Sequence, residues 1–149
     1  MPASRPFSAA PAVVLDTNVV FDWLVFGNPA VAPVIEGIRT GRLRWLACAA
    51  MRDEAAWTLA HGSLATRVAS LEQALTSFDT LVTWVDAPPT PAAPRLRCSD
   101  ASDQMFVDLA LQHRARWLLT RDRALLKLAR RARAHGLAIN APERWTAPA

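Results

Sequence analysis

The sequence predicts an α/β domain in which a mainly parallel sheet lies between two layers of helices. Short apolar runs that read as buried strands, such as Ala12–Leu15 and Trp117–Thr120, alternate with longer segments of helical periodicity. Both of these runs are followed by an aspartate: Asp16 comes immediately after the first, and Asp122 comes after the second with Arg121 between them. Carboxylates in such places are typical of open α/β sheets, which bind their ligands at the carboxyl ends of the strands.

The chain has the size and composition of one domain. Its 149 residues, 52% of them hydrophobic, suffice for a single core, which we predict to lie within residues 12–146. Residues 1–11 are proline and small residues for the most part and read as a flexible tail. No stretch approaches the roughly 20 uncharged apolar residues that span a bilayer, and we find no signal peptide. Two isolated cysteines, Cys48 and Cys98, fit a reducing compartment, so we expect a cytoplasmic protein without a membrane partner.

The first part of the domain alternates strands with pairs of helices. Gly27-Asn28-Pro29 breaks the first helical pattern, Gly41 ends the second and His61-Gly62 separates the third from the fourth. Apolar residues at helical spacing, such as Val31 and Val34, mark the buried faces. The predicted elements are strand Ala12–Leu15, helices Val19–Phe26 and Ala30–Thr40, strand Leu43–Ala47, helices Ala49–Ala60 and Ser63–Phe78, and strand Leu81–Val85.

The second part begins with a loop. Proline recurs in Asp86–Pro94, which can join neither a helix nor a strand ladder and is too short for an interdomain linker. Gly136 ends a strongly basic helical pattern. The predicted elements after the loop are helix Ala101–His113, strand Trp117–Thr120, helix Arg123–Ala134 and edge strand Leu137–Ile139.

Four acidic residues are candidates for one shared site, namely Asp16, Glu54, Asp103 and Asp122. Asp103 lies in the first turn of its predicted helix, and Glu54 lies beside an apolar helix face, where a carboxylate needs a partner. Carboxylates that come close together repel, and a hard divalent cation such as Mg²⁺ or Mn²⁺ removes that cost. One such ion, or a pair, can activate water and stabilise the charge that develops on a phosphodiester. The acids therefore indicate a divalent-metal site, and together with arginines that bind phosphate they would indicate a nuclease.

Positive charge is concentrated near the C-terminus, although the formal net charge is only +4. The segment between Gln112 and His135 contains many arginines and a lysine but one acidic residue, Asp122. Such a run suits a phosphate-rich partner; a solvated helix face is the alternative interpretation. Because the run flanks the acids, we expect contact with nucleic acid. The residues assigned to that contact are Arg121, Arg123, Lys127, Arg130, Arg131 and Arg133.

Four segments, taken in order, resemble the motifs of PIN-domain ribonucleases. They are Leu15-Asp16-Thr17-Asn18, Asp103–Ala110, Leu118–Leu126 and Ile139–Trp145. Together they cover nearly the whole chain. The segment Asp100-Ala-Ser-Asp103 is most similar to the PIN subgroup that forms the toxin component of bacterial toxin–antitoxin pairs. The resemblance implies a PIN-like three-layer α/β/α sandwich.

The resemblance also implies a function and its residues. It implies an endoribonuclease that uses Mg²⁺ or Mn²⁺, acts on RNA, and forms a homodimer neutralised by an antitoxin protein. The acids that it implies for catalysis and metal binding are Asp16, Glu54, Asp103 and Asp122, and the polar residues that it implies as their support are Thr17, Asn18 and Thr120.

Two positions leave alternatives open. The second motif is loose, since Cys48 stands where the family often has Ser six residues before its Glu, and either Asp53 or Glu54 is its acid. Asp100 is either a further ligand or the N-cap of the following helix.

Two other functions are compatible with parts of the pattern. A non-catalytic nucleic-acid-binding domain would keep only the basic segment, and the intact acids argue against it. A phosphoryl-acceptor domain would use Asp16, but it usually needs a second acid beside the acceptor and a strand-end lysine. Residue 18 is Asn, and the one lysine of the chain, Lys127, lies in a predicted helix.

Overall fold

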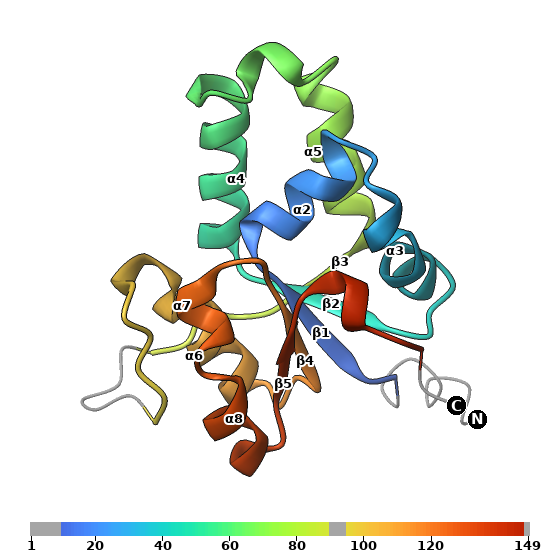
Figure 1. Ribbon diagram of the computed structural model, residues 1–149. Helices are drawn as coiled ribbons and strands as arrows, with labels where there is room; N and C mark the ends of the chain where they lie inside the picture. Colours follow the sequence, from blue (N-terminus) through green and yellow to red (C-terminus); the bar gives the residue numbers. More distant parts are fainter. Residues whose placement is uncertain (1–9, 90–94, 148–149) are drawn as a thin grey trace.

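A parallel sheet forms the centre of the molecule (Figure 1). The computed structural model describes residues 10–89 and 95–147, so that most of the predicted tail and part of the proline-rich loop lie outside the described residues. The sheet has five strands, all parallel, in the order β3-β2-β1-β4-β5. This confirms the predicted α/β/α architecture. The strands are β1 (Ala12–Leu15), β2 (Arg44–Ala47), β3 (Val82–Trp84), β4 (Trp117–Leu119) and β5 (Ala138–Asn140).

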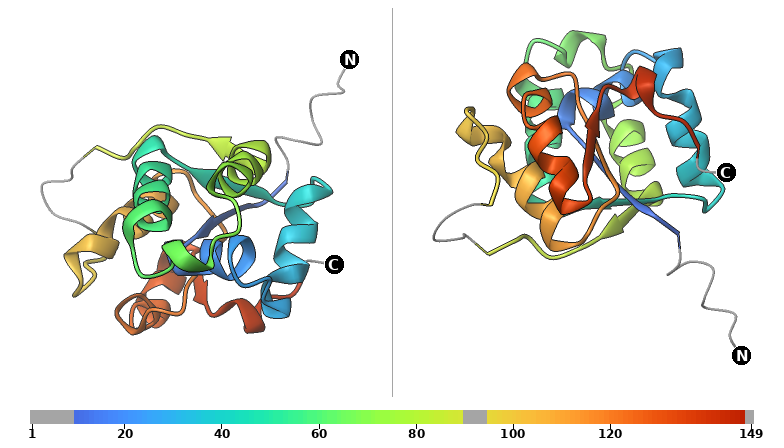
Figure 2. Two further views of the ribbon diagram at one scale, coloured as in Figure 1. Left: turned by 90° about the horizontal axis from the view of Figure 1, so that it is seen from above. Right: turned by 60° about the horizontal axis from the view of Figure 1, so that its bottom comes forward.

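Helices cover both faces of the sheet (Figures 1 and 2). They are α2 (Thr17–Leu24), α3 (Ala32–Arg39), α4 (Ala49–His61), α5 (Leu71–Leu81), α6 (Gln104–Gln112), α7 (Arg123–Leu126) and α8 (Ala129–Ala132). Short 3₁₀ turns supplement them: η1 (Pro29–Val31), η2 (Ala65–Arg67), η3 (Ala101–Asp103), η4 (Arg133–His135) and η5 (Pro142–Arg144). Helices α2 to α5 lie on one side, and α6 and α8 on the other.

The order of the strands reverses direction at β1. From β1 the chain moves outward through β2 to β3, and then returns to the other side of β1 to form β4 and β5. The carboxyl ends of β1 and β4 therefore meet at a topological switch point, the place where open α/β sheets bind their ligands.

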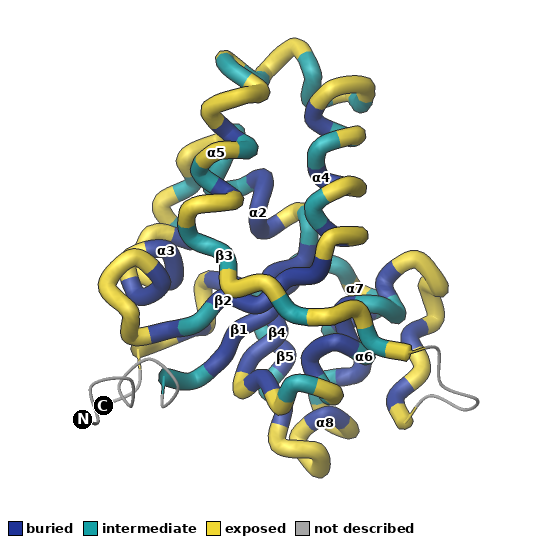
Figure 3. The backbone as a smooth tube through the Cα atoms, turned by 180° about the vertical axis from the view of Figure 1, so that it is seen from behind, coloured by how far each residue is buried: buried dark blue, intermediate teal, exposed yellow. Residues whose placement is uncertain are grey.

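The central strands are buried on both faces, as the tube coloured by burial shows (Figure 3). Val14 of β1 and Leu118 of β4 are completely buried. On the α2–α5 side, Trp45 packs edge-on against Trp23, with ring centroids 5.7 Å apart, and against Phe78 at 4.5 Å. Each fully buried side chain of this size contributes roughly 1.5–3 kcal/mol to folding. The central strands are therefore a rigid support for whatever follows them.

Among the described residues, no single helix is long and apolar enough to cross a membrane. The bent pair Thr17–Leu24 and Pro29–Arg39 passes the same test on length and composition alone.

Most helices begin or end within a few residues of their predicted bounds, and two predicted helices differ more. The predicted helix Ser63–Phe78 starts only at Leu71, because Ser70 is its N-cap and its hydroxyl accepts the N–H of Gln73 at 3.1 Å. Residues before the cap form only the single 3₁₀ turn η2.

The predicted basic helix Arg123–Ala134 is divided into α7, α8 and η4. At the division the N–H of Leu128 bonds to the carbonyl of Leu125 at 2.9 Å, a tightened i to i−3 bond. Leu125, Leu128 and Ala132 are all buried. The apolar face that predicts the helix is therefore preserved across the division.

Candidate active site

The acidic residues gather at the switch point between β1 and β4. Asp16 directly follows β1, and Asp122 lies three residues after β4. Leu15 pairs with Leu119 in the sheet, and the N–H of Asp16 donates to the carbonyl of Leu119 at 3.0 Å, so the two strand ends lie side by side. Two further acids, Asp100 and Asp103, lie in the segment that leads into α6. This helix packs against β1 and β4.

Asp100, Asp103 and Asp122 form the closest group of acids. One carboxylate oxygen from each lies within 4.8 Å of those of the other two. Asp122 Oδ1 also caps α7 by accepting the N–H of Ala124 at 2.7 Å. Asp100 Oδ1 caps η3, accepting the N–H and the hydroxyl of Ser102 at 3.0 and 2.7 Å. The two alternatives for Asp100 are thus compatible: it is an N-cap, and it also belongs to the acidic group.

Asp103 is the member of the group whose carboxylate is buried with one oxygen unpaired in the described part of the chain. Its side chain is buried, and its Oδ2 atom has no hydrogen-bond partner among the described residues. Burial is the main cause that raises the pKa of Asp103 to about 7, and the neighbouring carboxyl of Asp122 and the negative charges of Asp16 and Asp100 add to it. Without a cation, the group therefore holds a proton near neutral pH.

Thr120 connects the two strand-end acids. Its hydroxyl donates to Asp16 Oδ2 at 2.6 Å and accepts the N–H of Asp122 at 2.9 Å. Asp16 Oδ1 accepts the N–H of Asn18 at 3.3 Å. Burial raises the pKa of Asp16, and the hydrogen bond from Thr120 opposes that rise. Since Thr120 is itself fully buried, the position of Asp16 relative to Asp122 is closely defined.

The comparison with protein families agrees with this geometry. A family model described as PIN domain matches residues 12–124, which contain β1 to β4 and all of these acids. The chain belongs to the PIN-domain family. No match is found among curated proteins or among solved structures.

PIN domains are generally nucleases that use divalent metal ions, so the family supports a nuclease here. The acidic group of this PIN domain fits such an ion. Asp100, Asp103 and Asp122 offer only oxygen ligands, as hard cations prefer, and the unpartnered Oδ2 of Asp103 is a ligand atom that a cation would satisfy. A positive charge there would also offset the repulsion that raises the pKa of Asp103.

Glu54 does not belong to the closest group of acids. It is exposed on α4, the helix that follows β2, and is not one of the three acids whose oxygens meet. The neighbouring Asp53 is exposed as well. The catalytic role of Glu54, and the choice between it and Asp53, therefore stay predictions.

The polar residues predicted as support differ in what they contact. Thr120 binds Asp16 through its side chain, whereas Asn18 binds it through its backbone N–H and is itself exposed. Thr17, the first residue of α2, is half-buried, and its backbone N–H lowers the pKa of Asp16.

Arg121 is placed differently from the rest of the basic segment. Its Nε donates to Asp22 at 2.6 Å and its Nη1 to Glu143 at 2.7 Å, so it joins the β4–α7 loop to α2 and η5. Two carboxylates contact this guanidinium and compete with the phosphate contact that the sequence predicts for Arg121, so that contact stays a prediction. The remaining assigned residues are exposed and, within the described part of the chain, form no ion pair: Arg123, Lys127, Arg130, Arg131 and Arg133.

Sequence reasoning missed Gln104, which is the residue after Asp103. Its side chain hydrogen-bonds both to the loop that carries Asp100 and to Asp108, one turn further along α6. Gln and Asp four residues apart on one helix are a recognised hydrogen-bonding pair, and this spacing is the signal that the sequence contained.

Proposed function

We propose that this PIN domain is an endoribonuclease that depends on Mg²⁺ or Mn²⁺. The observation that carries the proposal is the buried, unpartnered Oδ2 of Asp103 within the group formed with Asp100 and Asp122. Structural carboxylates are normally paired with donors or cations. An oxygen left without a donor at a switch point supports a role as a metal ligand.

Each acid has a distinct part in this function. Asp100, Asp103 and Asp122 would hold the cation, which when bound activates water for attack on phosphorus and stabilises the charge on the phosphate oxygens. Asp16, held by Thr120 and by the N–H of Asn18, adds negative charge beside the group, since it contributes to the raised pKa of Asp103.

The exposed basic residues of α7, α8 and η4 supply the complementary charge. They begin with Arg123, the residue after Asp122, so a phosphate backbone bound along this segment would pass beside the acids. Binding of this kind depends on charge and not on base sequence. The choice of RNA over DNA rests on the resemblance to PIN-domain ribonucleases.

Cleavage of a labelled, mixed RNA pool tests the proposal. With Mn²⁺ or Mg²⁺ the wild type is expected to cut the pool, and with EDTA cutting is expected to stop. Protein that carries Asp16→Asn, purified in the same way, controls for contaminating ribonuclease. Folded wild type that binds RNA but cuts nothing with either metal would contradict the proposal and favour the non-catalytic alternative.

Salt dependence tests the basic segment. Replacing Arg130, Arg131 and Arg133 together by Ala is expected to weaken RNA binding and to lower the slope of log K against log salt by up to about 2, at roughly 0.7 per lost contact with single-stranded RNA. Fluorescence anisotropy measures the slope at salt concentrations from about 50 to about 200 mM, where phosphate contacts have a large effect on affinity.

A control with the same loss of charge separates local contact from net charge. Arg39, Arg42 and Arg67 are exposed on or near α3 and η2, away from the basic segment. Their joint replacement by Ala should leave the slope nearly unchanged. An equal reduction in both variants would refute the assignment of α8 and η4 to RNA.

We also propose that the protein is the toxin of a toxin–antitoxin pair and a homodimer. The toxin role rests on the similarity of Asp100-Ala-Ser-Asp103 to that PIN subgroup, and the homodimer rests on the resemblance of the four motifs to PIN-domain ribonucleases. Growth arrest on induced expression, relieved by the product of an adjacent gene, and the mass in solution measured by light scattering test them separately.

A further inference from the structure

Gln104 forms a clamp across the base of the loop that carries the metal-binding acids. It is the first residue of α6, and its side chain folds back onto the incoming chain. Its Oε1 accepts the N–H of Cys98 at 2.7 Å, and its Nε2 donates to the carbonyl of Leu96 at 2.7 Å. Nε2 also donates to Asp108 Oδ1 at 3.0 Å.

The side chain of Gln104 bonds to backbone groups that would otherwise pair with a neighbouring strand. Leu96 and Cys98 are buried and Arg97 between them is exposed, and this segment belongs to no strand. Gln104 bonds to the carbonyl of Leu96 and the N–H of Cys98, the two groups that a paired strand would engage on that side of the chain. The side-chain amide thus satisfies backbone groups that are partly buried.

The chemistry of the three partners requires an amide. Leu96 offers only a carbonyl and Asp108 only a carboxylate, so both need a donor, while the N–H of Cys98 needs an acceptor. Glutamate has nearly the same shape as glutamine but would set a carboxylate oxygen against two acceptors. Gln104→Glu therefore removes the donor that the clamp needs and adds one negative charge, while it keeps the shape of the side chain.

The clamp closes the loop on both sides of the acids. Cys98 lies two residues before Asp100, and Gln104 follows Asp103 directly. Asp103 is buried and continues into α6, whereas Asp100 is exposed. Within the described part of the chain, the side chain of Asp100 bonds to Ser102, and its carbonyl accepts the N–H of Asp103 at 3.1 Å. Loss of the clamp would therefore displace Asp100 more than Asp103.

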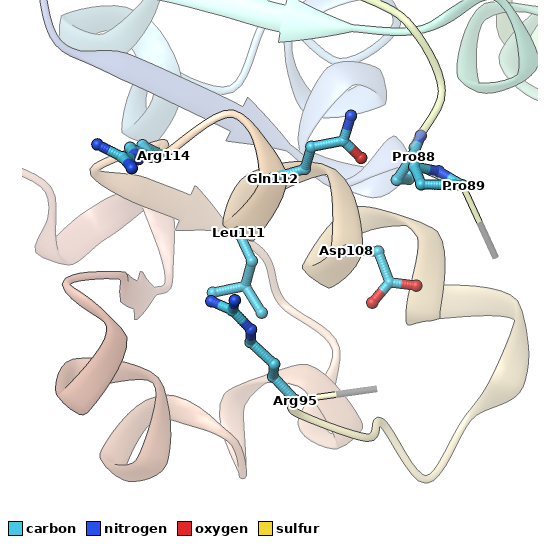
Figure 4. A pocket seen from close by; sticks show the side chains of 7 residues that line it. All are labelled: Pro88, Pro89, Arg95, Asp108, Leu111, Gln112 and Arg114. Atoms are coloured by element: carbon cyan, nitrogen blue, oxygen red, sulfur yellow. The ribbon is translucent and has the colours of Figure 1, made fainter. Parts of the chain in front are cut away.

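We infer that Gln104 is a positioning residue that sets Asp100 against Asp103 and Asp122, and with it the affinity of the metal site. This inference rests on the proposed function, because it concerns the same cation. Asp108 orients the amide from the next turn of α6, where it also lines a cavity of about 430 Å³ with Arg95 and Leu111 (Figure 4).

Metal affinity of the folded protein tests the inference. In Mn²⁺ titrations followed by calorimetry, Gln104→Glu is expected to lower affinity about 10–100-fold, the usual effect of removing a residue that orients a metal ligand. Gln112→Glu is the matched control, because it places the same charge on an exposed position of the same helix. It should bind Mn²⁺ like the wild type.

A second variant tests the polarity argument. In the double variant Gln104→Glu with Asp108→Asn, the new Asn can donate where the carboxylate could only accept, so part of the lost affinity should return. Circular dichroism at the titration temperature ensures that only folded protein is compared. Exchange of the Cys98 amide, followed by NMR without metal, should be faster in Gln104→Glu than in the wild type.

The outcomes separate the inference from the proposed function. Wild type that binds no Mn²⁺ would refute the proposed function, and the inference with it. Wild type that binds Mn²⁺ together with folded Gln104→Glu that binds it equally well, although the Cys98 amide exchanges faster, would overturn the inference alone.

Discussion

Asp103→Asn is expected to abolish metal-dependent cleavage of RNA and, at the same time, to stabilise the metal-free fold at pH 8. The loss of activity should be at least ~100-fold, because the variant removes a negatively charged metal ligand and with it several kcal/mol of stabilisation of the reacting phosphate. Single-turnover cleavage with Mn²⁺ measures this effect.

The gain in stability follows from the pKa of Asp103, which is raised to about 7 by burial and by neighbouring acids. Between about pH 4 and pH 7 the folded protein keeps a proton that the unfolded chain has released, so the free energy of unfolding falls as pH rises through this window. Asn carries no charge and avoids this loss. At 1.36 kcal/mol per pKa unit, the variant should gain on the order of 2–4 kcal/mol at pH 8.

Urea unfolding in EDTA at pH 5 and pH 8 measures the stability. The difference between Asp103→Asn and the wild type should shrink towards pH 5, where the wild-type carboxyl is protonated in the folded protein. Added Mn²⁺ should stabilise the wild type more at pH 8 than at pH 5, because the cation must displace the proton. A variant that is less stable than the wild type at pH 8 without metal would contradict the electrostatic account of the site.

Thr120→Val is expected to lower the free energy of unfolding by roughly 2–3 kcal/mol, although it preserves the volume and shape of the side chain. The variant removes the donor to Asp16 Oδ2 and the acceptor for the N–H of Asp122, both at a fully buried position. Urea unfolding at pH 7 in EDTA measures the loss.

The same variant should also change the pH dependence of cleavage. The hydrogen bond from Thr120 lowers the pKa of Asp16 against the effect of burial, so its loss should raise that pKa further. A higher pKa keeps Asp16 protonated to a higher pH. The acid limb of the pH–rate profile should therefore shift to higher pH. Thr120→Ser retains the hydroxyl and serves as the control; an equal shift in the Ser variant would show that the methyl group, and not the hydrogen bond, is responsible.

Much of the fold and part of the site could be predicted from local sequence patterns. The apolar run Ala12–Leu15 and the run from Trp117 are continuous and short, so they read as buried strands, and both are strands of the sheet. Asp16 and Asp122 come shortly after these strands in the sequence, so both lie at the carboxyl edge of the sheet. Helix starts were less predictable: the cap at Ser70 decided where α5 begins, against an apolar pattern that extends further back.

Other features depend on packing between distant segments. The strand order places β4 beside β1, and this alone allows Thr120 to bridge Asp16 and Asp122 across 104 positions of sequence. Arg121 was grouped with its basic neighbours because charge is counted along the chain, whereas its ion pairs with Asp22 and Glu143 depend on where α2 and η5 pack.

Local sequence patterns are enough to predict the α/β class, the two strand-end acids and the basic segment beside them, because strand periodicity and charge are properties of neighbouring residues. Packing between distant elements decides that the closest acids are Asp100, Asp103 and Asp122, and that Gln104 bonds to the loop that carries Asp100. These relations are distances and hydrogen bonds across separate elements, and they exist only once the helices are packed on the sheet.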